Sequence, residues 1–261
     1  MLFTSFEFLL FLPCVLAIYF CLRHDAQNLF LLLASYLFYG WWDWRFLVLL
    51  IFTTVLDFVV ALRIGAAPLN SRSRRRWLMV SLCSNLGVLA TFKYLGFFSR
   101  SLEAALASVG IHNQLPTINL ILPVGVSFYT FQSISYTVDV YRGSLAPATR
   151  LRDFALFVAF FPQLVAGPIE RATHMLPKYQ TPRRVDLTQV SSGLGLILIG
   201  LFRKLCIADA VSAEVSAAFS EPGQLTGPQL LRAAYLFALQ IYGDFAGYSD
   251  IARGTARLLG F

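Results

Sequence analysis

Apolar segments long enough to cross a bilayer dominate this chain. A membrane-spanning helix needs about 20 mostly apolar residues. Seven segments approach or exceed that length, at residues 3–22, 26–42, 45–62, 77–95, 118–141, 187–206 and 229–259. Only 13% of the 261 residues are charged, whereas a soluble domain carries about 25%. The sequence therefore predicts an all-α, polytopic transmembrane bundle and excludes a disordered chain, a nucleic-acid-binding arm and most soluble enzymes.

Two clusters of basic residues predict how the chain is oriented. Residues 63–76 contain five arginines and no acidic residue, and residues 142–186 contain seven lysines and arginines. Loops rich in lysine and arginine stay cytoplasmic. Three predicted spans precede the first cluster and two more separate the clusters, so both fall on one side. We expect two cytoplasmic loops in a single membrane domain covering residues 1–261, with the N-terminus outside. Either cluster can also bind an acidic partner or anionic lipid head groups.

The apolar run at residues 154–168 is too short to be another span. Pro162 and the pair Gly167-Pro168 interrupt it, and charged residues flank it on both sides. Irregular backbone at membrane depth is tolerated only against protein or a water-filled cavity. The run therefore predicts a re-entrant segment that lines a cavity, and Gln163, Gly167 and Pro168 are its candidate lining residues.

Polar residues form stripes along two of the predicted spans. In the span at residues 118–141, the stripe consists of Tyr129, Gln132, Tyr136 and Asp139. In the span at residues 229–259, it consists of Gln240, Asp244 and Tyr248, with Asp250 near a face of small residues, Gly243, Gly247 and Gly254. A polar stripe in an apolar helix faces the protein interior or water, because facing lipid is costly. Two interpretations stay open: hydrogen bonds between helices, or the lining of a substrate cavity.

The carboxylates within the predicted spans have two possible roles. Asp244 and Asp250 could serve function or could pair with an arginine. Asp57 does not belong to a polar stripe of this kind, so we expect a structural role for it. The small face at Gly243, Gly247 and Gly254 allows another helix to approach closely.

Motifs of common enzyme classes are missing from the sequence. It contains no nucleotide-binding glycine loop, no GxSxG and no HExxH. The four cysteines form no CxxC pair, so we expect no metal site and no bound cofactor. The three histidines, His24, His112 and His174, fall in predicted loops, where a solvated surface role is the usual one.

Four stretches together resemble the membrane-bound O-acyltransferase family, in particular the branch that acetylates alginate and similar exported polysaccharides. They are NLFLLLASYLFYGWWDWRF at residues 28–46, LPVGVSFYTFQSISYTVDVYRG at 122–143, FFPQLVAGPIER at 160–171 and QIYGDFAGYSDIARGTARLLGF at 240–261. The resemblance covers essentially the whole chain. The D-alanyltransferases of teichoic acid share its GPI and DFAGYS elements.

This resemblance implies a helical bundle around a funnel in the inner membrane of a bacterium. An acyl donor on the cytoplasmic side, an acetyl thioester or an acyl carrier, would meet a polysaccharide hydroxyl from outside. The implied partners are membrane lipids, the exported polysaccharide and extracytoplasmic acetylation proteins, with no nucleic acid.

The resemblance also implies a buried catalytic histidine, in a WRRWH-like stretch that would lie beyond Phe261. None of the three histidines present has that context, so we expect an N-terminal half that is inactive alone, and we assign no catalytic residue. Two hypotheses compete with this one: a non-catalytic scaffold of an exopolysaccharide complex, and a transporter. Transporters also contain broken helices and buried carboxylates like those predicted here.

Overall fold

The computed structural model describes residues 1–110, 121–164, 167–168, 170–221, 223 and 225–261. Over these residues the chain forms helices and no strand, which confirms the predicted all-α class. The helices are α1 (Phe6–Cys21), α2 (His24–Asp43), α3 (Arg45–Ala66), α4 (Arg72–Ser108), α5 (Val126–Arg142), α6 (Leu151–Ala159), α7 (Phe161–Leu164), α8 (Ala172–Gln180), α9 (Leu187–Phe202), the π-helix η1 (Arg203–Ala208), α10 (Asp209–Ser220) and α11 (Gly227–Leu258).

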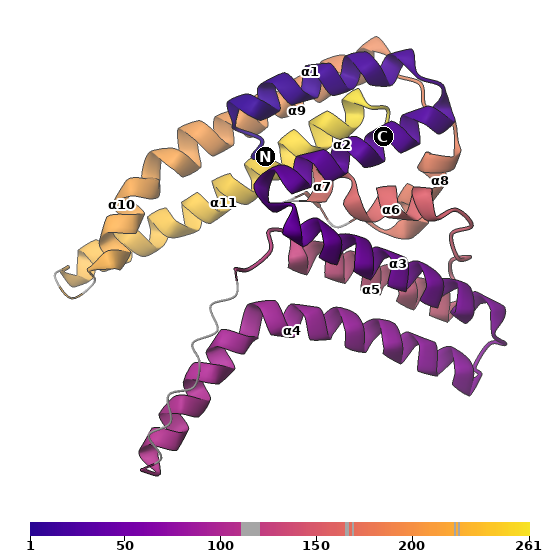
Figure 1. Cartoon of the computed structure of the whole chain (residues 1–261). Helices are drawn as coiled ribbons and strands as arrows, with labels where there is room; N and C mark the ends of the chain where they lie inside the picture. Colours follow the sequence, from indigo (N-terminus) through magenta and orange to yellow (C-terminus); the bar gives the residue numbers. More distant parts are fainter. Residues whose placement is uncertain (111–120, 165–166, 169, 222, 224) are drawn as a thin grey trace. The chain divides into compact units, whose positions relative to one another are not determined.

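The helices form two compact units (Figure 1). The first contains Met1–Trp42, Phe160–Pro168 and Gln180–Phe261, and the second contains Asp43–Ala159 and Ile169–Tyr179. Helices α3 and α4, both in the second unit, are the two in the described part of the chain that are long and apolar enough to cross a membrane by themselves. The single domain predicted from the sequence stays a prediction.

A buried polar cluster joins α3, α4 and α5 in the second unit. Asp57 on α3 is fully buried. Its carboxylate accepts a hydrogen bond from Ser81 Oγ at 2.6 Å and bonds from Asn85 Nδ2 at 2.9 and 3.0 Å. Ser81 Oγ also lies 3.2 Å from Thr137 Oγ1 on α5. Asp57 thus has the structural role expected of it, with polar partners supplied by neighbouring helices.

Glycines set the packing of α9 against α11 in the first unit. A Cβ added at Gly247 would lie 2.8 Å from the carbonyl oxygen of Gly200, and one added at Gly254 would lie 2.5 Å from that of Gly193. The two antiparallel helices therefore touch through backbone atoms at both levels (Figure 1). This is the close helix approach that the small face predicted. Tyr19 on α1 ties a third helix to this pair, because its hydroxyl donates to Leu259 O at 2.9 Å.

Several predicted boundaries are wrong. The span predicted at 77–95 is part of the longer, continuous 37-residue α4, which begins where Ser71 Oγ accepts from Arg74 N at 3.2 Å and ends at Ser108. The span predicted to begin at residue 118 becomes helical at Val126, because Gly125 caps it in the left-handed region with φ 76°.

Two more predictions about which residues are helical need correction. The segment predicted to end at residue 206 continues through η1 and α10 to Ser220. The two basic clusters are not simple loops, since the first is helical except at residues 67–71 and the second contains α6, α7 and α8. Charged residues are compatible with helices that end at or lie along a membrane surface, so charge alone did not mark the helix ends.

Candidate functional site

Two adjacent cations of η1 face two carboxylates of α11 in the first unit. Lys204 Nζ lies 2.6 Å from Asp244 Oδ1 and 2.6 Å from Asp209 Oδ1. One residue earlier, Arg203 donates to Asp250 Oδ2. We call these five residues the charge ladder. Charged groups this far within apolar helices are expensive unless they are paired, and here each cation has an acidic partner.

The π-helix is the local feature that presents these cations. A π-turn inserted in an α-helix widens it by about one residue and is frequent at functional sites. Gly243 of α11 packs directly against this turn: a Cβ there would lie 3.1 Å from Arg203 O and 3.1 Å from Ala208 Cβ. A glycine at this position thus brings α11 close enough for its carboxylates to reach the ladder cations.

The two carboxylates of the ladder differ in exposure. The side chain of Asp250 is 9% exposed and that of Asp244 is 33% exposed. Asp250 also lies 3.8 Å from Arg253 NH1, on its own helix. A buried carboxylate held by two guanidinium groups is typical of a structural element, whereas a partly open one can meet a substrate.

An apolar hollow of about 530 Å³ lies between α1, α9 and α11. Its lining includes Leu12, Leu201 and Ile251, together with Phe3 and Thr4 from the start of the chain. Phe3 packs against Tyr248, with ring centroids 6.0 Å apart. Lys204 Nζ lies 5.5 Å from the centroid of the Tyr248 ring. Tyr248 therefore lies between Phe3, which lines the hollow, and Lys204 of the charge ladder.

The other polar stripe lies in the second unit and makes internal contacts. Gln132 Nε2 donates to Phe157 O at 2.7 Å, which joins α5 to α6. Tyr136 Oη accepts from Ala148 N at 2.9 Å, and Tyr129 is fully buried. Asp139 is partly exposed at the last turn of α5. These contacts fit the interhelical interpretation of the stripe, and its role in lining a cavity stays a prediction.

The interrupted run at residues 154–168 folds as two short helices separated at Phe160. Its side chains are buried from Phe154 to Leu164, and Gln163 is only 6% exposed. Phe161 N donates to Ser35 Oγ of α2 at 3.1 Å, within the first unit. A Cβ at Gly167 would lie 2.4 Å from Gln163 Cα, so only glycine fits at this position. The sequence predicted a re-entrant segment that lines a cavity, and both parts of that expectation stay predictions.

The histidines were placed in loops by the sequence, and two of those placements are wrong. His24 begins α2 and is partly buried, and His174 lies on α8 and is exposed. The sequence had placed both histidines in loops because they fall between the predicted spans. His112 lies outside the described residues.

The described part of the chain contains no group of three or more His, Cys, Asp or Glu side chains placed to hold a metal ion. The carboxylates of the charge ladder instead form ion pairs with Arg203 and Lys204.

Sequence reasoning identified Asp244, Tyr248 and Asp250 but not their cationic partners. Arg203 and Lys204 are adjacent cations near the end of an otherwise apolar segment, a pattern that could have indicated intramembrane ion pairs. Gln240 lies one turn before Asp244 and is partly exposed. The structure also separates the predicted cavity residues between the two units: Tyr129, Gln132, Tyr136 and Asp139 in one, and Gln163, Gly167, Pro168, Gln240, Asp244, Tyr248 and Asp250 in the other.

Curated proteins similar to this chain point to one kind of enzyme. The chain is 40% identical over 263 residues to the probable alginate O-acetylase AlgI of Pseudomonas syringae pv. tomato, covering 100% of the chain and 50% of that protein. It is 34% identical over 275 residues to the peptidoglycan O-acetyltransferase of Helicobacter pylori, covering 94% of the chain and 51% of that protein. These similarities confirm the resemblance to the membrane-bound O-acyltransferases.

More distant members of the same group match a shorter part. The teichoic acid D-alanyltransferase of Streptococcus thermophilus is 29% identical over 156 residues, or 56% of this chain and 37% of that protein. No protein-family model matches the chain. The chain spans about half the length of the O-acetylase and O-acetyltransferase relatives.

Proposed function

We propose that this chain is part of a membrane-bound O-acyltransferase that moves an acyl group, such as acetyl, to hydroxyl groups of an exported polysaccharide. The observation that carries the proposal is the 40% identity to an alginate O-acetylase over the whole chain. A second relative is named a peptidoglycan O-acetyltransferase. The acceptor that the two names share is a hydroxyl group of a glycan. No observation on the chain favours a transporter or a scaffold over this function.

The chemistry explains why the reaction belongs in a membrane bundle. A base removes the proton of the sugar hydroxyl while its oxygen attacks the acyl carbonyl, and the carrier thiol leaves with a proton. Water would compete with the sugar for an acyl thioester, so the site has to exclude it. The hollow between α1, α9 and α11 has an apolar lining, which suits an acyl group whose polar carrier stays at the rim, toward the charge ladder.

We assign Asp244 to that rim and Asp250 to the support of the bundle. Asp244 is the more exposed of the two carboxylates, and it shares Lys204 with Asp209. The described histidines are His24, at the start of α2, and exposed His174 on α8, neither of which belongs to the ladder. We therefore assign no base within this chain, and the group that activates the hydroxyl is expected in the part of the enzyme that the longer relatives contain.

The proposed placement is the inner membrane, with seven spans, a re-entrant segment at 154–168, the N-terminus outside and both basic clusters in the cytoplasm. Two apolar helices of spanning length and the membrane-type relatives support it. The donor would be an acetyl thioester or an acyl carrier on the cytoplasmic side. The acceptor would arrive from outside, with extracytoplasmic proteins that present it.

Deletion of the coding region in its own host tests this function. We expect O-acetyl groups to disappear from an exported polysaccharide, measured by proton NMR of the purified polymer, while the amount of polymer stays unchanged. Acetyl esters should be measured on peptidoglycan in the same cells. Loss from the exported polysaccharide supports the proposal; loss from peptidoglycan alone moves the acceptor to the cell wall, and no loss from either contradicts it.

A further inference from the structure

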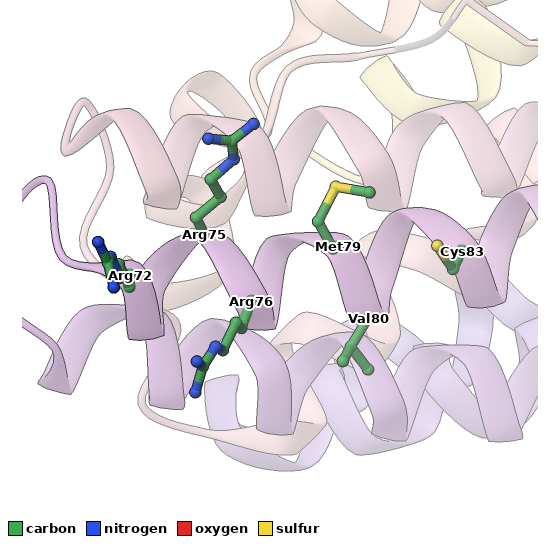
Figure 2. A pocket seen from close by; sticks show the side chains of 6 residues that line it. All are labelled: Arg72, Arg75, Arg76, Met79, Val80 and Cys83. Atoms are coloured by element: carbon green, nitrogen blue, oxygen red, sulfur yellow. The ribbon is translucent and has the colours of Figure 1, made fainter.

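The outer face of α4 combines exposed arginines with an apolar strip. Ser81, Asn85 and Leu89 are buried on the face that packs toward α3 and α5. On the opposite face, six residues line an open hollow of about 560 Å³: Arg72, Arg75, Arg76, Met79, Val80 and Cys83. Figure 2 shows these side chains in order along the helix, with the arginines at its start and the uncharged residues following.

The order of these side chains matches the layers of a membrane surface. Trp77 follows the arginines directly, and the guanidinium of Arg63 lies 5.9 Å from the centroid of its ring. Tryptophan concentrates at the level of lipid head groups. From Arg76 to Cys83 the helix rises about 10 Å. The arginines therefore lie at the head-group level when Met79, Val80 and Cys83 lie at the edge of the hydrocarbon.

The guanidinium groups of this face are open to a ligand. Arg72, Arg75 and Arg76 are exposed. Their neighbour Arg74 differs: it is 5% exposed, and its Nε donates to Tyr141 O at 2.9 Å. No acidic residue occurs between residues 63 and 76. Guanidinium groups bind phosphate through paired, charge-assisted hydrogen bonds, so three of them above an apolar strip complement an anion that carries a chain.

We propose that this face of α4 binds an anionic phospholipid, with its phosphate on Arg72, Arg75 and Arg76 and an acyl chain along Met79, Val80 and Cys83. The positive-inside rule explains why a cytoplasmic loop contains many positive charges. It does not explain why these charges share one face of a helix. Positions i, i+3 and i+4 do share a face, and the uncharged residues at Met79, Val80 and Cys83 continue it. The site is independent of the proposed acyl transfer.

Quenching of Trp77 by brominated lipid tests the site. In the 261-residue chain, Trp41, Trp42 and Trp44 are replaced by Phe, so that Trp77 is the remaining tryptophan. The protein is placed in phosphatidylcholine vesicles containing an equal amount of either brominated phosphatidylglycerol or brominated phosphatidylcholine. We expect the relative association constant at Trp77 to favour phosphatidylglycerol by about 10²-fold, from roughly a fivefold gain for each of the three arginines near an anionic surface.

A charge-matched control separates a site from general surface charge. The variant Arg72→Gln, Arg75→Gln, Arg76→Gln should lose the preference. The control Arg142→Gln, Lys178→Gln, Arg184→Gln removes the same charge from exposed positions of the second basic cluster and should keep it. Circular dichroism checks that both variants retain their helix, and Arg75→Gln alone, with a smaller expected loss, replaces the triple variant if that one unfolds.

Three results would overturn the proposal. Equal quenching by both brominated lipids would show no preference for an anionic head group. An equal loss in the two triple variants would assign the effect to net charge rather than to this face. Absence of quenching by either lipid would show that protein, not lipid, covers the face.

Discussion

A Cβ placed on Gly254 of α11 would lie 2.5 Å from the carbonyl oxygen of Gly193 on α9. The two helices meet there without side chains between them, and Gly200 and Gly247 repeat the contact seven residues away on each helix. This backbone contact holds the ladder of η1 and α11 in register, because η1 continues directly from α9.

Replacing Gly254 with alanine should therefore destabilise the first unit. We expect a loss of about 1–3 kcal/mol, typical of an overpacked core, measured as the fraction of protein that stays folded on heating in detergent. Gly195→Ala is the matched control on α9, since a Cβ there meets nothing within 4 Å. The control should be neutral or slightly stabilising, because alanine favours a helix more than glycine does. Equal loss in both variants would contradict the close contact.

The buried cluster around Asp57 should behave as a coupled unit. Asp57→Ala leaves the donors of Ser81 and Asn85 without their acceptor, at a cost of about 1–3 kcal/mol for buried polar groups. A double-mutant cycle with Asn85→Ala, measured by thermal unfolding in detergent, should show a clearly non-additive interaction. Thr91→Ala on the same helix removes an exposed hydroxyl that bonds only within α4 and should have little effect. Additive losses at Asp57 and Asn85 would contradict the cluster.

Substitutions of the two α11 carboxylates in the charge ladder should have different effects, one on the stability of the protein and the other on its turnover. Asp250→Asn removes the charge of the buried partner of Arg203 and should mainly lower the amount of folded protein in membranes. Asp244→Asn should leave folded protein near normal, because Lys204 keeps its contact with Asp209, and should mainly lower acyl transfer. Both are measured in a chimera that joins this chain to the unmatched half of the P. syringae acetylase. Equal losses of folded protein would remove the reason to assign Asp244 to function.

The proposed topology predicts which positions an impermeant thiol reagent can reach. In a chain whose four cysteines are replaced by serine, single cysteines at Ser73 and Thr181 should resist labelling in intact cells and react after lysis. A cysteine at Asn113 should react in intact cells. Labelling at both Ser73 and Thr181 from outside would reverse the orientation.

The sequence predicted the helical class well, because apolar length and the scarcity of charge constrain a membrane protein strongly. It also identified the close approach at Gly247 and Gly254, since spacing alone puts small residues on one face. Helix ends were predicted less well: the extension of α4 to Ser108 depends on a helix that tolerates both interior glycines and charged residues. The partners of Asp244 and Asp250 were missed because a π-turn at Arg203–Ala208 changes which side chains face α11, and no residue spacing signals such a turn.

The most direct test of the central claim is the acetyl ester content of alginate exported by a Pseudomonas strain that lacks its own acetylase. The chimera described above should restore esters well above the background of the deleted strain, and the 261-residue chain alone, present in the membrane at a similar level, should not. A chimera that reaches the membrane folded but restores no esters would contradict the claim that this chain forms half of an acyltransferase. Esters made by the chain alone would contradict the claim that its catalytic base lies elsewhere.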